Sequence, residues 1–439
     1  MTVKTRIAPS PTGWLHIGTA RTALFCYLYA KHHGGKFAIR SEDTDRARSL
    51  PEYEEEILAG LAWLGLEHDE FVRQSERVSR HQELLEKLVE EGKAYVSEEE
   101  SKSEAGKMVQ IVRLKNPGKS VTFTDLVRGE ITFDTSDLGD FVIARAIDDP
   151  LYHFAVVVDD MDMEITHVIR GEDHISNTPR QILIQEALGA PRPAYAHLPL
   201  ILAPDRTKLS KRHGATSIAD YRSEGFLPEA FVNYIGMLGW NPGNDREEYS
   251  LAEFVEAFEL DGVQKHGAIW NREKLLDVNQ QWMRKLSDED FIVQGGITAP
   301  DDTKLRMIVP LLKERAKTFK EARDMITGEL ACMFSAPTLD TALLTVKDVG
   351  GNTATHLQRL LNLFPDLHEG MTADEIKAVL MPYADTVSKE EGGRGAALWP
   401  LRYALSGEER SPDPFTLISI LGAGESGVRI QNALDILKG

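Results

Sequence analysis

The stretch PSPTGWLHIGTAR, residues 9–21, decides the predicted fold. It follows a short strand at Thr5 to Ala8 and leads into a helix with apolar periodicity from about Leu15 to His33, which glycines at 34–35 end. A strand, a turn with Pro and Gly, and a helix form a nucleotide-binding opening, because the amides at a helix N-terminus attract phosphate. The stretch therefore predicts an α/β fold with a phosphate-binding loop.

Three residues of this stretch are candidates for phosphate contact. His16 can donate a hydrogen bond to a phosphate oxygen, Gly18 lets a nucleotide approach the backbone, and Thr19 lies where the loop enters the helix. The alternative is an exposed loop with a histidine at the start of a helix, which so short a pattern does not exclude by itself.

The segments that follow continue in βαβ order. A strand at Lys36 to Arg40 precedes a helix that begins near Pro51, so we expect a parallel sheet. From about Tyr95 to Val158 the pattern changes to short β-prone runs, which indicate an inserted subdomain. Within it, Val96 to Lys107 is predicted to be a solvated helix or a flexible connector. The βα pattern then resumes with a strand at 165–169 and a helix at about 177–188.

Beyond about Gly214 the pattern is chiefly helical, so the C-terminal part is predicted to be a helical appendage. Its amphipathic segments lie near 227–238, 251–258, 303–318, 357–362, 373–380 and 414–421.

A second cluster of candidate residues is KLSKR at 208–212, which follows a strand-like run by a short Pro-Asp turn. Lys208, Lys211 and Arg212 are suited to neutralise the charge that develops when pyrophosphate leaves ATP, and Ser210 supplies a hydroxyl. Taken alone, the five residues fit an exposed basic loop equally well, so the inference depends on the two clusters together.

The two clusters, in this order along the chain, resemble the two motifs of class I aminoacyl-tRNA synthetases. Within that class the chain is similar to the bacterial-type glutamyl-tRNA synthetases of the glutamyl/glutaminyl branch. The resemblance is close across roughly 5–282 and looser toward the C-terminus. It rests on PSPTGWLHIGTAR (9–21), RSEDTDRAR (40–48), THVIRGEDHISNTPRQ (166–181), GFLPEAFVNY (225–234), LLKERAKTF (311–319) and PLRYALSGEERSP (400–412).

This resemblance implies a Rossmann-type α/β catalytic domain with an inserted α+β subdomain for the tRNA acceptor end, followed by all-helical domains. The implied bounds are 1–82 and 163–213 for the catalytic domain, 83–162 for the insertion, 214–300 for a stem-contact domain and 301–439 for an anticodon-binding region.

The implied reaction attaches L-glutamate to tRNA(Glu) through a glutamyl-adenylate, consumes ATP with its Mg²⁺, and releases AMP and pyrophosphate. Catalysis would rest on positioning and on stabilising phosphate charge. The residues implied for catalysis are His16, Gly18, Thr19, Lys208, Ser210, Lys211 and Arg212. Those implied for ATP binding are His16, Gly18, Ile201, Lys208, Leu209 and Lys211.

The family's glutamate-binding positions fall on Arg6, Ala8, Ser10, Glu42, Tyr152 and Arg170. Arg6 matches the residue that pairs with the substrate side-chain carboxylate, and a guanidinium suits that role because it forms a bidentate pair. Glu42 matches the acid near the substrate ammonium, although a local salt bridge with Arg40 or Arg46 is the alternative. For Tyr152 the alternative is ordinary core packing.

The chain departs from many relatives in its insertion, because the stretch 95–112 contains no Cys and no His and is shortened. We therefore expect no structural zinc and no other protein-bound metal. The two cysteines, Cys26 and Cys332, lie far apart in sequence and are predicted to be buried and unreactive.

Length and composition set further limits. A chain of 439 residues exceeds what one core usually organises, and no apolar run approaches the roughly 20 residues needed to cross a bilayer. A cytoplasmic location is expected because no secretory signal is visible, and a monomer because no coiled-coil or repeat pattern occurs. The net charge of −19 leaves tRNA binding open, since 50 basic residues suffice for a local basic face.

Several alternatives are less compatible with the sequence. A shortened paralogue that modifies an anticodon base would lack the helical region, and a glutaminyl-tRNA synthetase would carry a β-barrel there. Intact His16 and Lys208 argue against an inactive tRNA-binding protein, and no Gly-x-Gly-x-x-Gly follows the first strand as a dinucleotide enzyme requires. The sequence does not decide whether the enzyme charges tRNA(Glu) alone or also tRNA(Gln), because no anticodon-reading residue is identified.

Overall fold

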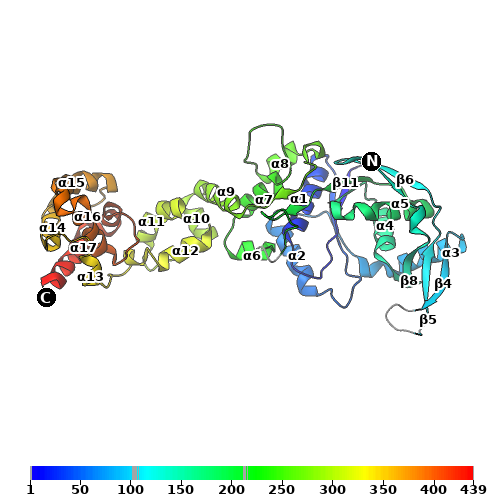
Figure 1. The fold of residues 1–439 in the computed structure, drawn as a ribbon, viewed down its shortest axis with the longest axis horizontal. Coiled ribbons are helices and arrows are strands. Elements are labelled where there is room, and N and C mark those ends of the chain that lie inside the picture. Colours follow the sequence, from blue (N-terminus) through cyan, green and yellow to red (C-terminus); the bar gives the residue numbers. More distant parts are fainter. Residues whose placement is uncertain (1, 101–105, 107, 211–213, 215, 439) are drawn as a thin grey trace. The chain divides into compact units, whose positions relative to one another are not determined.

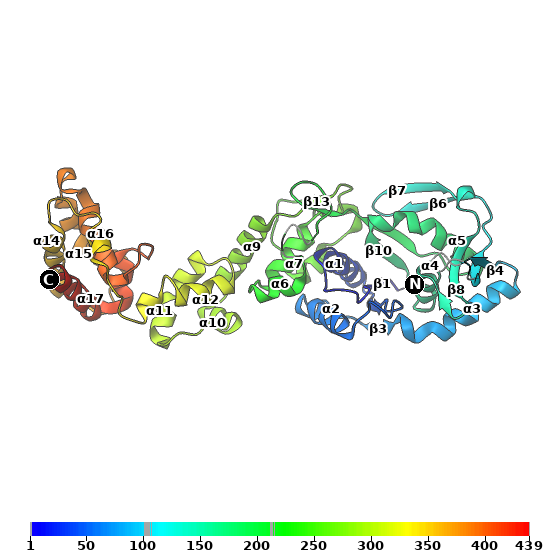
Figure 2. The same ribbon diagram turned by 60° about the horizontal axis from the view of Figure 1, so that its bottom comes forward.

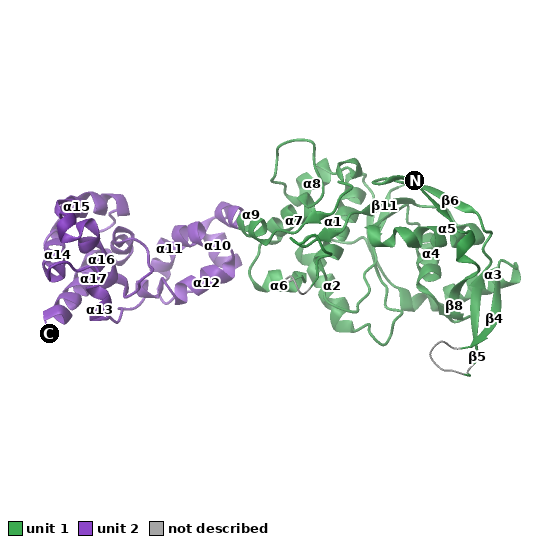
Figure 3. Cartoon of the chain, viewed as in Figure 1, with its two compact units in different colours: residues 1–279 green, residues 280–439 purple. Residues whose placement is uncertain are grey.

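The computed structural model describes residues 2–100, 106, 108–210, 214 and 216–438. The chain forms two compact units, residues 1–279 and residues 280–439, shown in different colours in Figure 3. None of the helices in the described part of the chain is long and apolar enough to span a membrane.

Parallel strands form the centre of the first unit (Figure 1). One sheet has the order β1 (Lys4–Ile7), β2 (Lys36–Ser41), β3 (Glu70–Arg73). A second has the order β10 (His167–Gly171), β11 (Ala194–Leu198), β6 (Ser120–Asp125), β7 (Gly129–Asp134), in which only β6 and β7 are antiparallel. The two sheets meet where the Lys4 carbonyl accepts from the Thr166 amide at 3.0 Å. The predicted parallel sheet is therefore confirmed.

Helices cover both faces of these strands and enclose two apolar cores. The first core surrounds α1 (Ile17–His32), whose residues Ala20, Leu24 and Leu28 are fully buried. The second lies between α3 (Val78–Glu90), α4 (Tyr152–Asp162) and α5 (Thr178–Leu188), and it includes Val168 of β10. Helix α2 (Pro51–Trp63) has its proline in the first turn, where no amide is needed.

The segment predicted to be an insertion contains an antiparallel sheet of β4 (Ala94–Glu100), β5 (Met108–Leu114), β8 (Phe141–Ala146) and β9 (Asp149–Pro150). The prediction of a solvated helix or flexible connector at 96–107 was wrong for 96–100, because these residues pair with β5 in the register Val96 to Val112. Residues 101–105 and 107 of that prediction lie outside the described residues. No helix was predicted for the apolar run from Phe154, which is helical in α4, since packing against α3 and α5 overrides strand propensity.

The remainder of the first unit consists of short strands and helices after β11. Strands β12 (Ile201–Leu202) and β13 (Ala268–Ile269) pair in parallel. Capping boxes begin α6 (Ile218–Ser223) at Ser217 and α8 (Leu251–Ala257) at Ser250. The other two helices are α7 (Pro228–Met237) and α9 (Arg272–Lys285).

The second unit is all-helical in its described residues, as the sequence predicts. The helices are α10 (Asp288–Gly295), α11 (Asp302–Arg315), α12 (Phe319–Thr327), α13 (Thr341–Leu344), α14 (Thr353–Leu361), α15 (Ala373–Thr386), α16 (Gly393–Ser406) and α17 (Pro414–Lys438). Helix α17 bends at Gly422, whose φ of 80° is left-handed and therefore suits glycine. The finer division of the chain into four domains stays a prediction.

Candidate active site

A pocket of about 720 Å³ opens at the carboxyl ends of the parallel strands in the first unit. Its lining follows β1, β2, β10 and β11 and includes the first turn of α1, which is the edge where open α/β sheets bind ligands. The candidate residues that line it are Arg6, Ala8, Ser10, His16, Gly18, Thr19, Glu42, Tyr152, Arg170, Ile201, Lys208 and Leu209. Ser210 is half-buried just beyond this lining, and Lys211 and Arg212 lie outside the described residues.

His16 is the residue that caps the N-terminus of α1. Its Nδ1 accepts a hydrogen bond from the Gly18 amide at 3.1 Å. In the neutral ring the proton therefore lies on Nε2, which makes Nε2 a donor. A side chain added at Gly18 would meet only His16, at 3.6 Å, so packing within the protein does not explain the glycine.

The segment that carries Lys208 folds back onto β12. The Leu209 amide donates to the Ile201 carbonyl at 3.1 Å, which fixes this part of the loop beside the pocket. Lys208 is exposed, and its Nζ lies 3.0 Å from Asp173 Oδ2. The ammonium group therefore lies at the pocket mouth. Solvent screens its ion pair with Asp173, so a ligand can take the place of that carboxylate.

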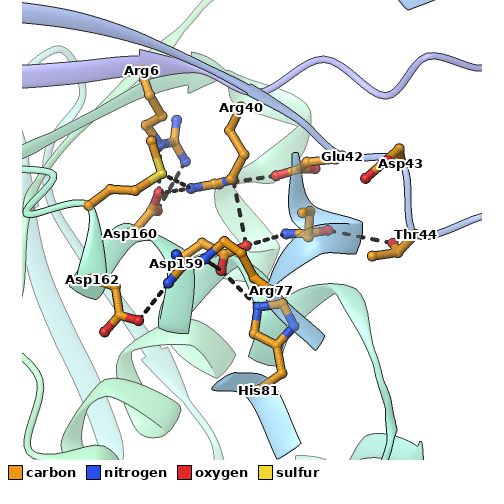
Figure 4. A network of polar contacts seen from close by, with 12 residues as sticks. Arg6, Arg40, Glu42, Asp43, Thr44, Arg77, His81, Asp159, Asp160 and Asp162 are labelled. Atoms are coloured by element: carbon orange, nitrogen blue, oxygen red, sulfur yellow. Dashed lines mark hydrogen bonds and ion pairs between the residues drawn. The ribbon is translucent and has the colours of Figure 1, made fainter. Parts of the chain in front are cut away.

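Arg6 enters the pocket from β1 as part of a buried ion cluster, shown in Figure 4. Its Nε donates to Asp160 Oδ1 at 2.9 Å, and its Nη2 donates to Asp160 Oδ2 at 3.2 Å. Arg40, which is fully buried, donates to the same Oδ1 at 2.6 Å. Burial would raise the pKa of Asp160, but the charges of Arg40 and Arg6 outweigh it and lower that pKa to about 2.

A second acid on α4, Asp159, extends this cluster toward α3. Asp159 is fully buried and accepts hydrogen bonds from Arg77 Nε at 2.6 Å and Gln74 Nε2 at 2.8 Å. His81 Nε2 lies 2.7 Å from the same carboxylate (Figure 4). The adjacent acids thus hold α4 to the β1–β2 strands on one side and to α3 on the other.

Glu42 and Tyr152 line the same pocket as Arg6. Glu42 Oε1 accepts from Arg40 Nη2 at 3.1 Å, so the local salt bridge considered as an alternative is present. Burial nevertheless raises the pKa of Glu42, with Arg40 opposing. Burial and the charge of Glu42 raise the pKa of Tyr152 to about 12, so its hydroxyl keeps its proton at neutral pH.

Arg170 of β10 is another buried arginine of the pocket lining, and it forms no ion pair with a carboxylate among the described residues. It donates instead to neutral groups: His197 Nε2 at 3.1 Å, Gln181 Oε1 at 2.8 Å and Thr178 Oγ1 at 2.8 Å. Burial lowers the pKa of Arg170. An uncompensated buried cation of this kind favours a carboxylate ligand.

Comparisons with known proteins agree on one family. The family described as tRNA synthetases class I (E and Q), catalytic domain, matches residues 2–104 and 97–277, and an anticodon binding domain matches 274–434. A glutamate–tRNA ligase of Thiobacillus denitrificans is 40% identical, with 98% of each chain covered. The chain belongs to the glutamate–tRNA ligases. A second ligase, from Aquifex aeolicus, is 39% identical over 99% of each chain.

Solved glutamate–tRNA ligases have the same fold. A ligase from Elizabethkingia meningosepticum, solved in complex with its amino acid, has a TM-score of 0.87 at 32% identity and covers 100% of both chains. A ligase from Elizabethkingia anophelis has a TM-score of 0.83 at 31% identity, with 99% of this chain and 100% of that chain covered. The predicted family and fold class are thereby confirmed.

Some residues that line the pocket of this class I synthetase, or that contact its lining, were missed from the sequence. Asp160 lies in the run FAVVVDDMD, where adjacent acids within an apolar helix were an available signal. Arg21 of α1 is buried and donates to the carbonyls of Leu238, at 3.3 Å, and of Pro199. It thereby fixes the start of the segment that leads to Ile201, although its position in the motif alone does not indicate this contact.

Proposed function

We propose that this glutamate–tRNA ligase binds glutamate and ATP side by side in the pocket and joins them as glutamyl-adenylate before transfer to tRNA(Glu). The observation that carries this proposal is that two buried arginines of the parallel strands, Arg6 of β1 and Arg170 of β10, line the same pocket as the His16 end of α1. One end of the pocket thus suits carboxylates, and the other suits phosphate.

The glutamate end is formed by Arg6, Arg170, Tyr152 and Glu42. Asp160 engages Nε and Nη2 of Arg6, which leaves Nη1 to donate to the side-chain carboxylate of the substrate. Glutamine offers a neutral amide, which forms a weaker bond with a guanidinium. Glu42 places negative charge near the substrate ammonium, and Ala8 and Ser10 border the same space.

The ATP end is formed by the first turn of α1 and by the segment after β12. His16 Nε2 donates to a phosphate oxygen, while Gly18 and Thr19 let the phosphates approach the helix N-terminus. Lys208, with Ser210, Lys211 and Arg212, stabilises the charge that develops as pyrophosphate leaves. Ile201 and Leu209 border the nucleotide, and Mg²⁺ arrives with ATP as part of the substrate.

Beyond the pocket, the proposal extends to partners and location. The helices of residues 280–439 bind the anticodon arm of tRNA(Glu), in keeping with the anticodon-binding match. Glutamate then passes from the adenylate to the terminal ribose of the tRNA. The enzyme acts as a monomer in the cytoplasm. Charging of purified tRNA(Gln) with glutamate shows whether the enzyme also accepts that tRNA.

Attachment of radiolabelled glutamate to purified tRNA(Glu) and tRNA(Gln) tests this proposal. We expect wild type to charge tRNA(Glu), and Lys208→Ala to slow charging by about 10²-fold because one cation near the leaving phosphate is lost. Lys87→Ala is a matched control, since Lys87 is also exposed and pairs with one acid, Glu91, at 3.9 Å. If wild type binds ATP but charges neither tRNA, the proposed reaction fails for these substrates.

The shortened insertion leads to a separate expectation about zinc. No group of three or more His, Cys, Asp or Glu in the described part of the chain is arranged to hold a metal ion. We expect elemental analysis to find no stoichiometric zinc and a zinc-selective chelator, added with excess Mg²⁺, to leave charging unchanged. One zinc per chain, or a loss of activity that zinc restores, would contradict this expectation.

A further inference from the structure

Arg170 contacts His197, a residue of β11 that is not part of the pocket lining. Arg170 Nε carries a proton, so His197 Nε2, 3.1 Å away, accepts and holds none. The proton of the neutral ring then lies on Nδ1, which donates to Asp125 Oδ2 at 2.6 Å. Both side chains of the His197–Asp125 pair are 0% exposed, so water does not replace either contact.

Asp125 is itself fixed by the backbone around it. It ends β6, and its Oδ1 accepts from the amides of Val127 at 3.0 Å and Arg128 at 2.8 Å, in the turn to β7. Its Oδ2 also accepts from the His197 amide at 3.1 Å. Burial would raise the pKa of Asp125, but the bonds from His197 and these amides lower it, and the carboxylate stays ionised.

The β6–β7 hairpin that carries Asp125 lies at the edge of the β10–β11 sheet, as Figure 2 shows. Asp125 faces Tyr195 of β11 in the register of the two strands. Asp125, which belongs to the segment expected to be an insertion, is therefore linked to Arg170 at the glutamate end of the pocket through the buried imidazole of His197.

We infer that Asp125 and His197 are positioning residues, which hold the Arg170 guanidinium toward the carboxylate of bound glutamate. This inference rests on the proposed role of Arg170 in binding that carboxylate. Without the Asp125 charge the imidazole adopts its other tautomer, which places an Nε2 proton against the Arg170 Nε proton. Two facing donors repel each other, so Arg170 turns away from the geometry that the substrate needs.

A tautomer measurement on the unaltered enzyme tests the first half of the inference. The chain has 13 histidines, and selective ¹⁵N-histidine labelling distinguishes a protonated from an unprotonated ring nitrogen. The His197 signals are assigned as those that disappear in His197→Gln. We expect Nδ1 to be protonated and Nε2 to be unprotonated. A protonated Nε2 would overturn the inference, and this result needs no folded Asp125 variant.

Binding and kinetic measurements test the second half. We expect Asp125→Asn to weaken glutamate binding by about tenfold or more, because a charge-assisted bond is lost, with the KM for ATP unchanged. Asp134→Asn is the matched control, since Asp134 lies on the same hairpin but is exposed, and among the described residues its carboxylate bonds only to Ser136. The ¹⁵N spectrum of Asp125→Asn should show protonation at His197 Nε2, which a purely structural role does not predict.

Arg170→Gln separates failure of this inference from failure of the proposed site. If Arg170→Gln loses glutamate binding while Asp125→Asn binds glutamate as wild type does, the positioning role is overturned and the site remains. If Arg170→Gln binds glutamate normally, the proposed role of Arg170 is overturned, and the inference falls with it.

Discussion

Asp160→Asn is expected to lower the free energy of unfolding by about 3–5 kcal/mol, because it leaves two buried guanidinium groups without their shared carboxylate. Arg6 is 4% exposed and Arg40 is 0% exposed, so solvent cannot take over the lost contact. Asparagine keeps the volume of aspartate, which limits the effect to charge and hydrogen bonding. Denaturant unfolding of wild type and variant at neutral pH measures the difference.

The pH dependence of this difference follows from the pKa of Asp160, which is about 2 in the folded protein. An unfolded aspartate titrates near 3.9, so the folded-state pKa is depressed and the stabilisation is fully present above about pH 4. It is lost as the pH falls toward 2, and the gap between wild type and Asp160→Asn should narrow there. Across pH 6 to 8 the gap should stay constant.

Asp162→Asn is the matched control for this substitution. Asp162 ends the same helix and also pairs with two arginines, Arg77 at 2.5 Å and Arg80 at 3.0 Å, but its side chain is 20% exposed. Its replacement should cost about 1 kcal/mol or less, as for other solvent-accessible pairs. If Asp160→Asn and Asp162→Asn lower the free energy of unfolding equally, burial does not determine how much the Arg6–Asp160–Arg40 cluster contributes to stability.

Arg6→Gln is expected to reduce kcat/KM for glutamate by about 10³-fold while leaving the KM for ATP unchanged. The substrate carboxylate would lose a charged donor that is itself only 4% exposed. The variant should still fold, because Asp160 keeps Arg40 at 2.6 Å as its remaining partner. Steady-state charging of tRNA(Glu) at varied glutamate and varied ATP concentrations separates the two effects.

Lys36→Gln provides the comparison for Arg6→Gln. Lys36 begins β2, pairs with Lys4 in the register of the sheet and is exposed at the strand end away from the pocket. Lys36→Gln removes one positive charge from the same sheet, as Arg6→Gln does. The kinetics of Lys36→Gln should nevertheless match those of wild type. A normal kcat/KM in Arg6→Gln would mean that Arg6 serves only the buried cluster and that Arg170 carries carboxylate binding alone.

The sequence predicted those elements whose pattern is local. The opening strand, the helix after His16 and the helices of residues 280–439 follow from apolar periodicity and from Gly, Pro and capping residues. Strand β4 was missed because its run SEEE is polar, and only pairing with β5 makes it extended. Helix α4 was missed because a Val-rich run favours a strand unless tertiary packing decides otherwise.

The same difference between local pattern and long-range contact applies to the residues of the candidate site. The two motifs and the family resemblance identified many residues of the pocket lining, such as His16 and Arg170, but not others, such as Gln74 and His174. They did not identify Asp160, which is 154 residues from Arg6, or Asp125, which is 72 residues from His197. Contacts over such separations depend on how strands are ordered, and no local pattern encodes that order.

The burial of Cys26 and Cys332 has a practical consequence. Cys26 is 0% exposed in the first unit and Cys332 is 5% exposed in the second, and burial raises their pKa values to about 12 and about 11. A thiol-specific probe therefore reacts with either sulfur only after the surrounding unit opens. Since these are the only cysteines of the chain, each unit carries one natural reporter of its own unfolding. Labelling followed by peptide mapping would time the opening of the two units separately, in the unaltered protein.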